Sequence, residues 1–175
     1  ISSFLNIQDE KIREKVNSEL LSKKLIPEPL IQFNPSYKVG GTIESLINSG
    51  SLSLNKELLN VFSGFELYQH QKEAIEMGCR DESFVVTSGT GSGKSLTYIA
   101  TILNKIFNDG IEKPGIKAVI VYPMNALINS QFNALTEFAN IYEKNPGAIF
   151  PSFGKYTGQE SEECRDQLRL KPPHI

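Results

Sequence analysis

Apolar positions recur at two different spacings along the chain, and the spacing changes near residue 64. In DEKIREKVNSELLSKK, residues 9–24, apolar side chains fall about one helical turn apart with charges between them, which predicts an amphipathic helix that packs on a neighbour or a partner. The Pro-containing run 26–41 predicts an irregular connector. Two short helices are predicted next, TIESLINSG ending at Gly50 and NKELLNVF with Asn55 as its N-cap. We expect residues 1–63 to form a helical accessory extension.

The part of the chain after residue 64 alternates short apolar runs with longer segments of helical spacing. The predicted helices cover 67–78, 93–108 and 125–142, and the predicted strands cover 84–87, 117–122 and, more weakly, 150–157. Strands that alternate with helices at this spacing predict right-handed βαβ units. The expected class is therefore α/β, with a parallel sheet that carries helices on both faces over residues 64–175. The last residues, LKPPHI, are typical of the approach to a further strand, so the expected sheet is incomplete.

Composition narrows the possible functions. Apolar residues make up 39% of the chain and charged residues 22%, which is ordinary for a soluble protein. No apolar run approaches a membrane span and the opening residues do not resemble a signal peptide, so we expect a cytoplasmic protein with no membrane partner. The net charge of −2 argues against a broad surface for polyanions, so any nucleic-acid contact must be local. Cys79 and Cys164 are interpreted as free thiols, and two histidines are too few for a His-based metal site.

A glycine-rich loop between the first predicted strand and the next helix carries the strongest chemical signal. The pattern G-x-x-x-x-G-K-[ST] is met at Gly93, Lys94 and Ser95, while Ser88 stands where the pattern has its first glycine. Glycines here let backbone N–H groups form a nest for phosphates at a helix N-terminus. Lys94 is expected to neutralise the β and γ phosphates and the Ser95 hydroxyl to bind Mg²⁺. The predicted nucleotide-binding residues of the loop are Ser88, Gly89, Thr90, Gly91, Ser92, Gly93, Lys94, Ser95 and Leu96, of which Lys94 and Ser95 are the candidate catalytic residues.

The segment LYQHQKEAI precedes this loop and suggests which base is bound. The side-chain amide of Gln71 both donates and accepts, which matches the N6 and N7 edge of adenine and not guanine. A glutamine on a helix is usually only solvated, so this interpretation gains its weight from the loop that follows.

The order LYQHQKEAI, TSGTGSGKS, YPMNALINSQ and YTGQ resembles the N-terminal motor domain of superfamily 2 helicases. The residues of these motifs are similar to those of the DEAD/DEAH-box branch with a C-terminal helicase-associated region. This branch includes bacterial repair and phage-defence helicases. The resemblance runs from about residue 40 to the end of the chain. It implies a P-loop NTPase fold of RecA-like type, with Gln71 selecting adenine, Tyr68 stacking nearby, and ATP and Mg²⁺ as ligands.

The resemblance also implies a path for a nucleic-acid strand. Seven residues are implied to lie along it: Pro123, Asn125, Ala126, Leu127, Gln131, Thr157 and Gly158. The N-terminus of the helix near Asn125 and the turn at Gly158 expose N–H groups that can hold backbone phosphates without reading bases. Many relatives have a basic residue where this chain has Asn125.

We expect two further parts of the motor beyond Ile175: the acidic motif that completes the Mg²⁺ site, and the second RecA-like domain with its arginine finger. This chain alone should therefore bind ATP weakly and barely hydrolyse it. The predicted function is the ATP-binding portion of an ATP-dependent helicase or translocase, with DNA favoured over RNA through the family branch. The alternatives are a nucleotide-gated scaffold that orders residues 1–63 against a protein partner, an RNA helicase, or a P-loop small-molecule kinase or transporter ATPase.

Overall fold

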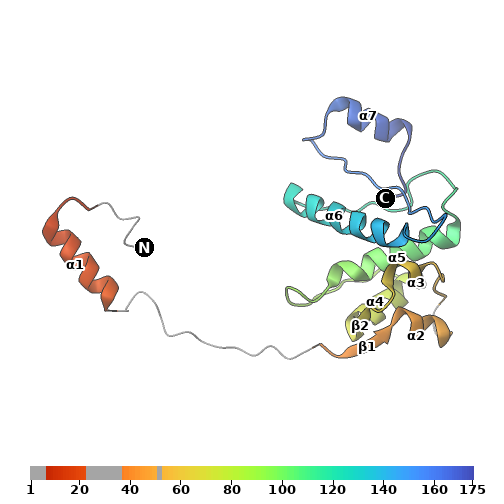
Figure 1. The fold of residues 1–175 in the computed structure, drawn as a ribbon, viewed down its shortest axis with the longest axis horizontal. Coiled ribbons are helices and arrows are strands. Elements are labelled where there is room, and N and C mark those ends of the chain that lie inside the picture. Colours follow the sequence, from red (N-terminus) through yellow and green to blue (C-terminus); the bar gives the residue numbers. More distant parts are fainter. Residues whose placement is uncertain (1–6, 23–36, 51–52) are drawn as a thin grey trace. The chain divides into compact units, whose positions relative to one another are not determined.

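The computed structural model describes residues 7–22, 37–50 and 53–175, which fall into two compact units divided after residue 36 (Figure 1). In the first unit, α1 covers Glu10–Leu21. Its N-cap is Asp9, whose carboxylate accepts a hydrogen bond from the Ile12 N–H at 3.0 Å. The predicted helix is confirmed, but Ile12 is 56% exposed and Leu21 81% exposed, so α1 has no buried face among the described residues 7–22.

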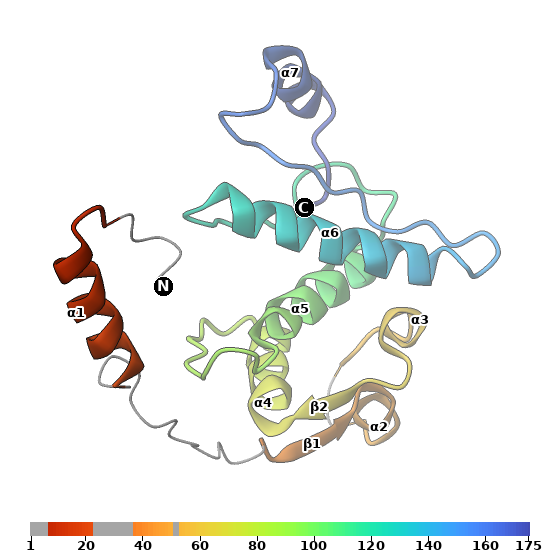
Figure 2. The same cartoon turned by 60° about the vertical axis from the view of Figure 1, so that its left-hand side comes forward.

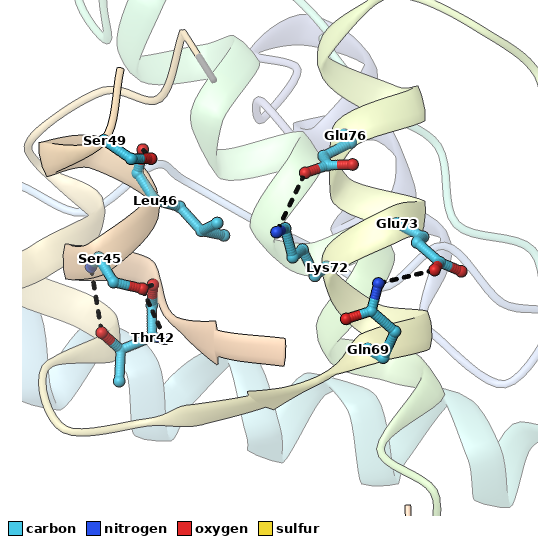
Figure 3. A network of polar contacts seen from close by, with 8 residues as sticks. All are labelled: Thr42, Ser45, Leu46, Ser49, Gln69, Lys72, Glu73 and Glu76. Carbon is cyan, nitrogen blue, oxygen red and sulfur yellow. Dashed lines mark hydrogen bonds and ion pairs between the residues drawn. The ribbon is translucent and has the colours of Figure 1, made fainter. Parts of the chain in front are cut away.

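The second unit begins with a small antiparallel sheet of β1 (Val39–Thr42) and β2 (Glu66–Tyr68). The helix α2, Ile43–Asn48, follows β1 at once through a reciprocal cap. Thr42 Oγ1 accepts from the Ser45 N–H at 3.1 Å and Ser45 Oγ accepts from the Thr42 N–H at 3.0 Å (Figure 3). The sequence predicted α2 but not β1, most of which lies in the predicted connector 26–41. Residues 26–36 of that connector lie outside the described residues.

A single apolar core joins the short helices to the longer ones. The helix α3, Leu58–Phe62, buries Leu58, Val61 and Phe62, and α2 buries Ile43 and Leu46. These side chains belong to the same core cluster as apolar residues of the later helices α4, α5 and α6. The predicted boundary between an accessory extension, 1–63, and the ATP-binding domain stays a prediction. The part of the extension from residue 37 onward belongs to the same compact unit as the rest of the chain, 37–175. Asn55 is not the N-cap of α3, since that position is Glu57.

The three long helices of this unit follow the sequence pattern closely. The helix α4 covers Gln69–Cys79, α5 covers Lys94–Asp109 and α6 covers Asn125–Tyr142. Figure 2 shows α5 lying between α4 and α6, and the contacts of α5 with α4 are extensive. On the exposed side of α4, Gln69 donates to Glu73 at 2.8 Å and Lys72 pairs with Glu76 at 3.8 Å (Figure 3). Every helix in the described ranges is too short or too polar to cross a bilayer.

The three predicted strands are not assigned to a ladder. Within residues 7–22, 37–50 and 53–175, ladder pairing joins β1 to β2, whereas 84–87, 117–122 and 150–157 carry no strand assignment. Side chains still alternate along 84–87 and 118–122 as they do in strands: Val85 is 88% exposed, Val119 75% and Val121 84%, while Phe84, Val86 and Ile120 are half-buried. Parallel strands gain their stability from neighbours on both sides, and these segments have few.

A short set of backbone hydrogen bonds nevertheless joins two of these segments, 117–122 and 150–157, to the final residues. The carbonyl oxygen of His174 accepts from the Lys117 and Ala118 N–H groups at 2.8 and 3.0 Å. The N–H of His174 donates to the Ser152 carbonyl at 2.9 Å, and the N–H of Gly154 donates to the Ile175 carbonyl at 3.0 Å. The final residues therefore run between 117–118 and 152–154, as expected for an approach to a further strand. The helix α7, Glu162–Leu170, lies before these final residues and was not predicted. Its N-cap is Ser161, whose hydroxyl accepts from the Cys164 N–H at 3.2 Å.

Candidate functional site

The phosphate loop turns on two glycines and ends in a lysine that begins α5. Gly91 and Gly93 have φ values of 75° and 70°, in the left-handed region that favours glycine. The Lys94 ammonium donates to the carbonyl oxygens of Ser88 at 3.0 Å and Gly89 at 2.7 Å. The cation thus lies inside the loop, bonded to the loop's own backbone.

The side chains around this loop fit a nucleotide triphosphate with Mg²⁺. A Cβ at Gly91 would meet open space, so the backbone there is open to a ligand. The loop leads into the N-terminus of a 16-residue helix, whose dipole favours an anion, and it brings one cation to the same place. The half-buried Ser95 follows Lys94 and carries the hydroxyl that would bind Mg²⁺. When bound, the metal would supply charge to the β and γ phosphates; Lys94 would exchange its carbonyl partners for phosphate oxygens.

Gln71 lies behind the loop and not on its open side. Its side chain is 3% exposed. Its Oε1 accepts from the Tyr68 N–H at 2.8 Å, and its Nε2 donates to the Gly93 carbonyl at 2.9 Å. A glutamine oxygen has two lone pairs, so one remains for the adenine N6 amino group. The adenine contact of Gln71 stays a prediction, but its role as a link between β2 and the loop is structural.

Two aromatic residues beside Tyr68 reach the same loop, and neither was predicted. The rings of Tyr37 and Tyr68 lie 5.1 Å apart between centroids, and the His70 ring stacks on Tyr68 at 5.8 Å. The Nε2 atom of His70 is 3.0 Å from the Ser92 carbonyl, and the Tyr37 hydroxyl lies beside Gly89. The position of His70 beside Gln71 in LYQHQ could have indicated that His70 also lies near the loop. Tyr37 carried none, because it lies far from the loop along the chain.

Four of the residues on the implied strand path form an exposed group at the start of α6. Pro123, Asn125, Ala126 and Leu127 are all exposed. Met124 is the N-cap of α6 and makes no side-chain capping bond, while the Leu127 N–H donates to the Met124 carbonyl at 3.1 Å, so Asn125 and Ala126 carry the N–H groups at the start of the helix. This arrangement suits a backbone phosphate of a nucleic acid, and the contact of these residues with a strand stays a prediction.

Thr157 and Gly158 lie in a turn just after Lys155, whose side chain bonds to Asn129 of α6. The Thr157 hydroxyl accepts from the Gln159 N–H at 3.3 Å. Lys155, just before this turn, donates to Asn129 Oδ1 at 3.1 Å and lies 5.1 Å from the centre of the Phe132 ring. The structure therefore brings the segment 155–158 against the first turns of α6. Lys155, which the sequence analysis did not single out, also pairs with Glu160 at 3.6 Å, so its positive charge is shared with that carboxylate.

The seventh residue of the implied path, Gln131, is half-buried and bonded to the helix that begins at Lys94. The Tyr98 hydroxyl donates to Gln131 Oε1 at 2.9 Å and also bonds the Tyr122 hydroxyl. Burial, followed by the bond with Tyr98, raises the pKa of Tyr122 above its usual value, so the Tyr122 hydroxyl is neutral near pH 7. Gln131 is thus tied to α5 and to the segment before Pro123.

Comparisons with known proteins agree with this geometry. Residues 68–175, more than half of the chain, match the model of the DEAD/DEAH box helicase family. The chain is 28% identical over 194 residues to Druantia protein DruE of Escherichia coli (strain UMEA 4076-1), covering 98% of this chain and 11% of that protein. It is 28% identical over 138 residues to the ATP-dependent RNA helicase ROK1 of Vanderwaltozyma polyspora, covering 77% of this chain and 22% of that helicase.

A solved structure shares the fold as well. The crystal structure of the DUF1998 helicase MrfA bound to DNA and AMPPNP superposes with a TM-score of 0.62 at 25% identity, covering 88% of this chain and 20% of that one. The chain thus spans only about a fifth or less of the length of DruE and MrfA. The predicted α/β, helicase-type class is confirmed by this likeness together with the family match. The chain belongs to the DEAD/DEAH box helicase family.

Proposed function

We propose that this chain is the ATP-binding part of an ATP-dependent DNA helicase or translocase, in which ATP binding and hydrolysis drive movement along a strand. The observation that carries the proposal is that one short unit holds two sites, a phosphate loop and a separate surface suited to a nucleic-acid backbone. The phosphate loop begins α5, and the exposed first turn of α6 with the 155–158 turn forms a second, separate surface. Family membership supports ATP as the nucleotide, and Mg²⁺ as its metal is part of the proposal.

DNA is proposed over RNA because the MrfA structure contains DNA and covers most of this chain, although ROK1 is named an RNA helicase. N–H groups at the start of α6 and the Lys155 ammonium hold phosphates, and phosphates alone do not distinguish the two nucleic acids. Phage defence and DNA repair are the two pathways that we propose, with a second RecA-like domain completing the motor. A protein partner for α1 belongs to the same proposal.

The test is the ATPase rate of the full-length protein with and without single-stranded DNA or RNA. We expect strong stimulation by DNA, and we expect Lys94→Ala to lower the stimulated rate on the order of 100-fold or more, because the substitution removes the cation that faces the phosphates. Lys105→Ala is the matched control: Lys105 lies on the same helix but pairs with Asp81 at 3.6 Å on the surface. An ATPase rate that changes with neither DNA nor RNA would contradict the helicase proposal and favour a nucleotide-gated scaffold.

A further inference from the structure

We propose that Tyr98 is a positioning residue that couples the ATP site to the nucleic-acid contact of Gln131; this inference rests on the proposed function. Tyr98 lies on α5 one helical turn after Lys94. Its hydroxyl is bonded to both Tyr122 and Gln131, which come from the segment before Pro123 and from α6. One oxygen atom thus joins the helix of the phosphate loop to two of the elements that carry the implied strand path.

The direction of these bonds follows from the donor count. A glutamine Oε1 only accepts, so the single hydroxyl hydrogen of Tyr98 is used in the bond to Gln131. The Tyr122 hydroxyl must then donate to Tyr98. The chain of donors therefore runs from Tyr122 to Tyr98 to Gln131, and Tyr98 is its central member.

This arrangement makes the two ends unequal. Removing the Tyr98 hydroxyl leaves both Tyr122 and Gln131 without the bond, whereas removing the Tyr122 hydroxyl leaves the bond from Tyr98 to Gln131 intact. All three side chains are half-buried, so a lost partner is not simply replaced by bulk water.

The coupling has a physical basis in the position of Lys94. Its ammonium is bonded to the Ser88 and Gly89 carbonyls and must leave them to reach phosphates. A shift at the first turn of a helix is carried to its second turn, where Tyr98 holds the Gln131 amide. Nucleotide binding would then change the orientation of Gln131, and a strand bound at Gln131 would, by reciprocity, change nucleotide affinity.

The experiment measures this reciprocity directly in the full-length protein. The readout is the ratio of the affinities for a non-hydrolysable ATP analogue with and without saturating single-stranded oligo(dT). For Tyr98→Phe we expect the ratio to fall at least threefold toward one, while the affinity without DNA changes less than twofold. For Tyr122→Phe the ratio should stay within twofold of the wild-type value.

Tyr142→Phe is the matched control, because the Tyr142 hydroxyl donates to Glu57 Oε2 at 2.7 Å in a buried place away from both sites. It should keep the wild-type ratio and melt at a temperature close to that of Tyr98→Phe. A double-mutant cycle adds a second measurement: in a Gln131→Ala background, Tyr98→Phe should lower the ratio no further.

Two results would overturn the inference alone: a wild-type ratio in Tyr98→Phe, or an equal loss from Tyr98→Phe with and without Gln131. A wild-type protein whose nucleotide affinity responds to neither DNA nor RNA would remove the proposed function and the inference together.

Discussion

The side-chain amide of Gln71 donates to the carbonyl oxygen of Gly93 at 2.9 Å, so the helix before the phosphate loop holds the residue at which the loop ends. The same side chain accepts from the Tyr68 N–H at 2.8 Å. One buried amide therefore fixes the end of β2 and the end of the loop relative to each other. Any role of Gln71 toward adenine is added to this structural one.

Gln71→Ala should destabilise the unit 37–175 by about 1–3 kcal/mol, because it leaves the Tyr68 N–H without its side-chain acceptor and removes one of the donors to the Gly93 carbonyl, which keeps the Leu96 N–H. Chemical denaturation gives the free energy of unfolding. Gln69→Ala is the control on the same helix, since the side-chain amide of Gln69 donates to Glu73 in an exposed i,i+4 pair (Figure 3); its effect should stay within about 0.5 kcal/mol. Equal effects of the two changes would contradict the role of Gln71.

Gly93→Ala should be more harmful than Gly91→Ala, although both residues have left-handed backbones. The strain of a side chain in that region costs each variant about 1–2 kcal/mol. A Cβ at Gly93 would also lie 2.4 Å from Gln71 Nε2, whereas one at Gly91 meets nothing within 4 Å. The difference between their free energies of unfolding isolates the contact with Gln71. It should vanish in a Gln71→Ala background, and a difference that persists there would refute this reason.

Lys155→Gln should weaken binding of single-stranded DNA by the full-length protein and reduce the slope of log affinity against log salt by about one, as expected for one lost phosphate contact. The reason is the position of Lys155 beside the Thr157 turn, where Asn129 holds its ammonium. Lys144→Gln removes the same charge from an exposed position two residues past the C-terminal end of α6. Fluorescence anisotropy at several salt concentrations measures both variants, and matching slopes would exclude a direct contact of Lys155.

The Tyr142–Glu57 bond predicts a loss of stability at alkaline pH. Burial, and then the hydrogen bond and charge of Glu57, raise the pKa of Tyr142 from 10.0 to about 12. The folded state therefore favours the protonated hydroxyl; the stabilisation is complete below pH 10, the unfolded value, and is lost as the pH rises toward 12. We expect the wild type to lose on the order of 1 kcal/mol more than Tyr142→Phe over this window.

Unfolding measured from pH 8 to pH 12 checks this difference, since other groups titrate in both proteins. Parallel curves for the two proteins would show that Tyr142 titrates alike in the folded and unfolded states.

The sequence was a good guide where one segment determines its own structure. Helices α5 and α6 occupy the predicted residues because their apolar spacing, a Gly at each end of α5 and the strand-to-helix turn at Pro123 are local signals. The pairing of β1 with β2 was missed, since VGGT and ELY are short and their register depends on residues far apart in the chain. Helix α7 was missed because its pattern is almost wholly polar.

The candidate site divides in the same way. The phosphate loop was predicted as a local motif. The contacts of Tyr37, Tyr98 and Lys155 could not be, because each depends on which distant segment the fold brings to it.

The outward-facing valines of 84–87 and 117–122 bear on how the chain behaves in the test tube. Val85, Val119 and Val121 project from extended segments outside the β1–β2 ladder of the described structure. An extended apolar segment with free backbone groups is a template for another chain, and a charged side chain on it discourages such pairing. Residues 1–175 produced alone should self-associate as their concentration rises, and Val119→Lys should reduce the light scattering of that solution. Aggregation of this piece would then reflect uncovered strand edges, and not a failure of the α4–α5–α6 core to fold.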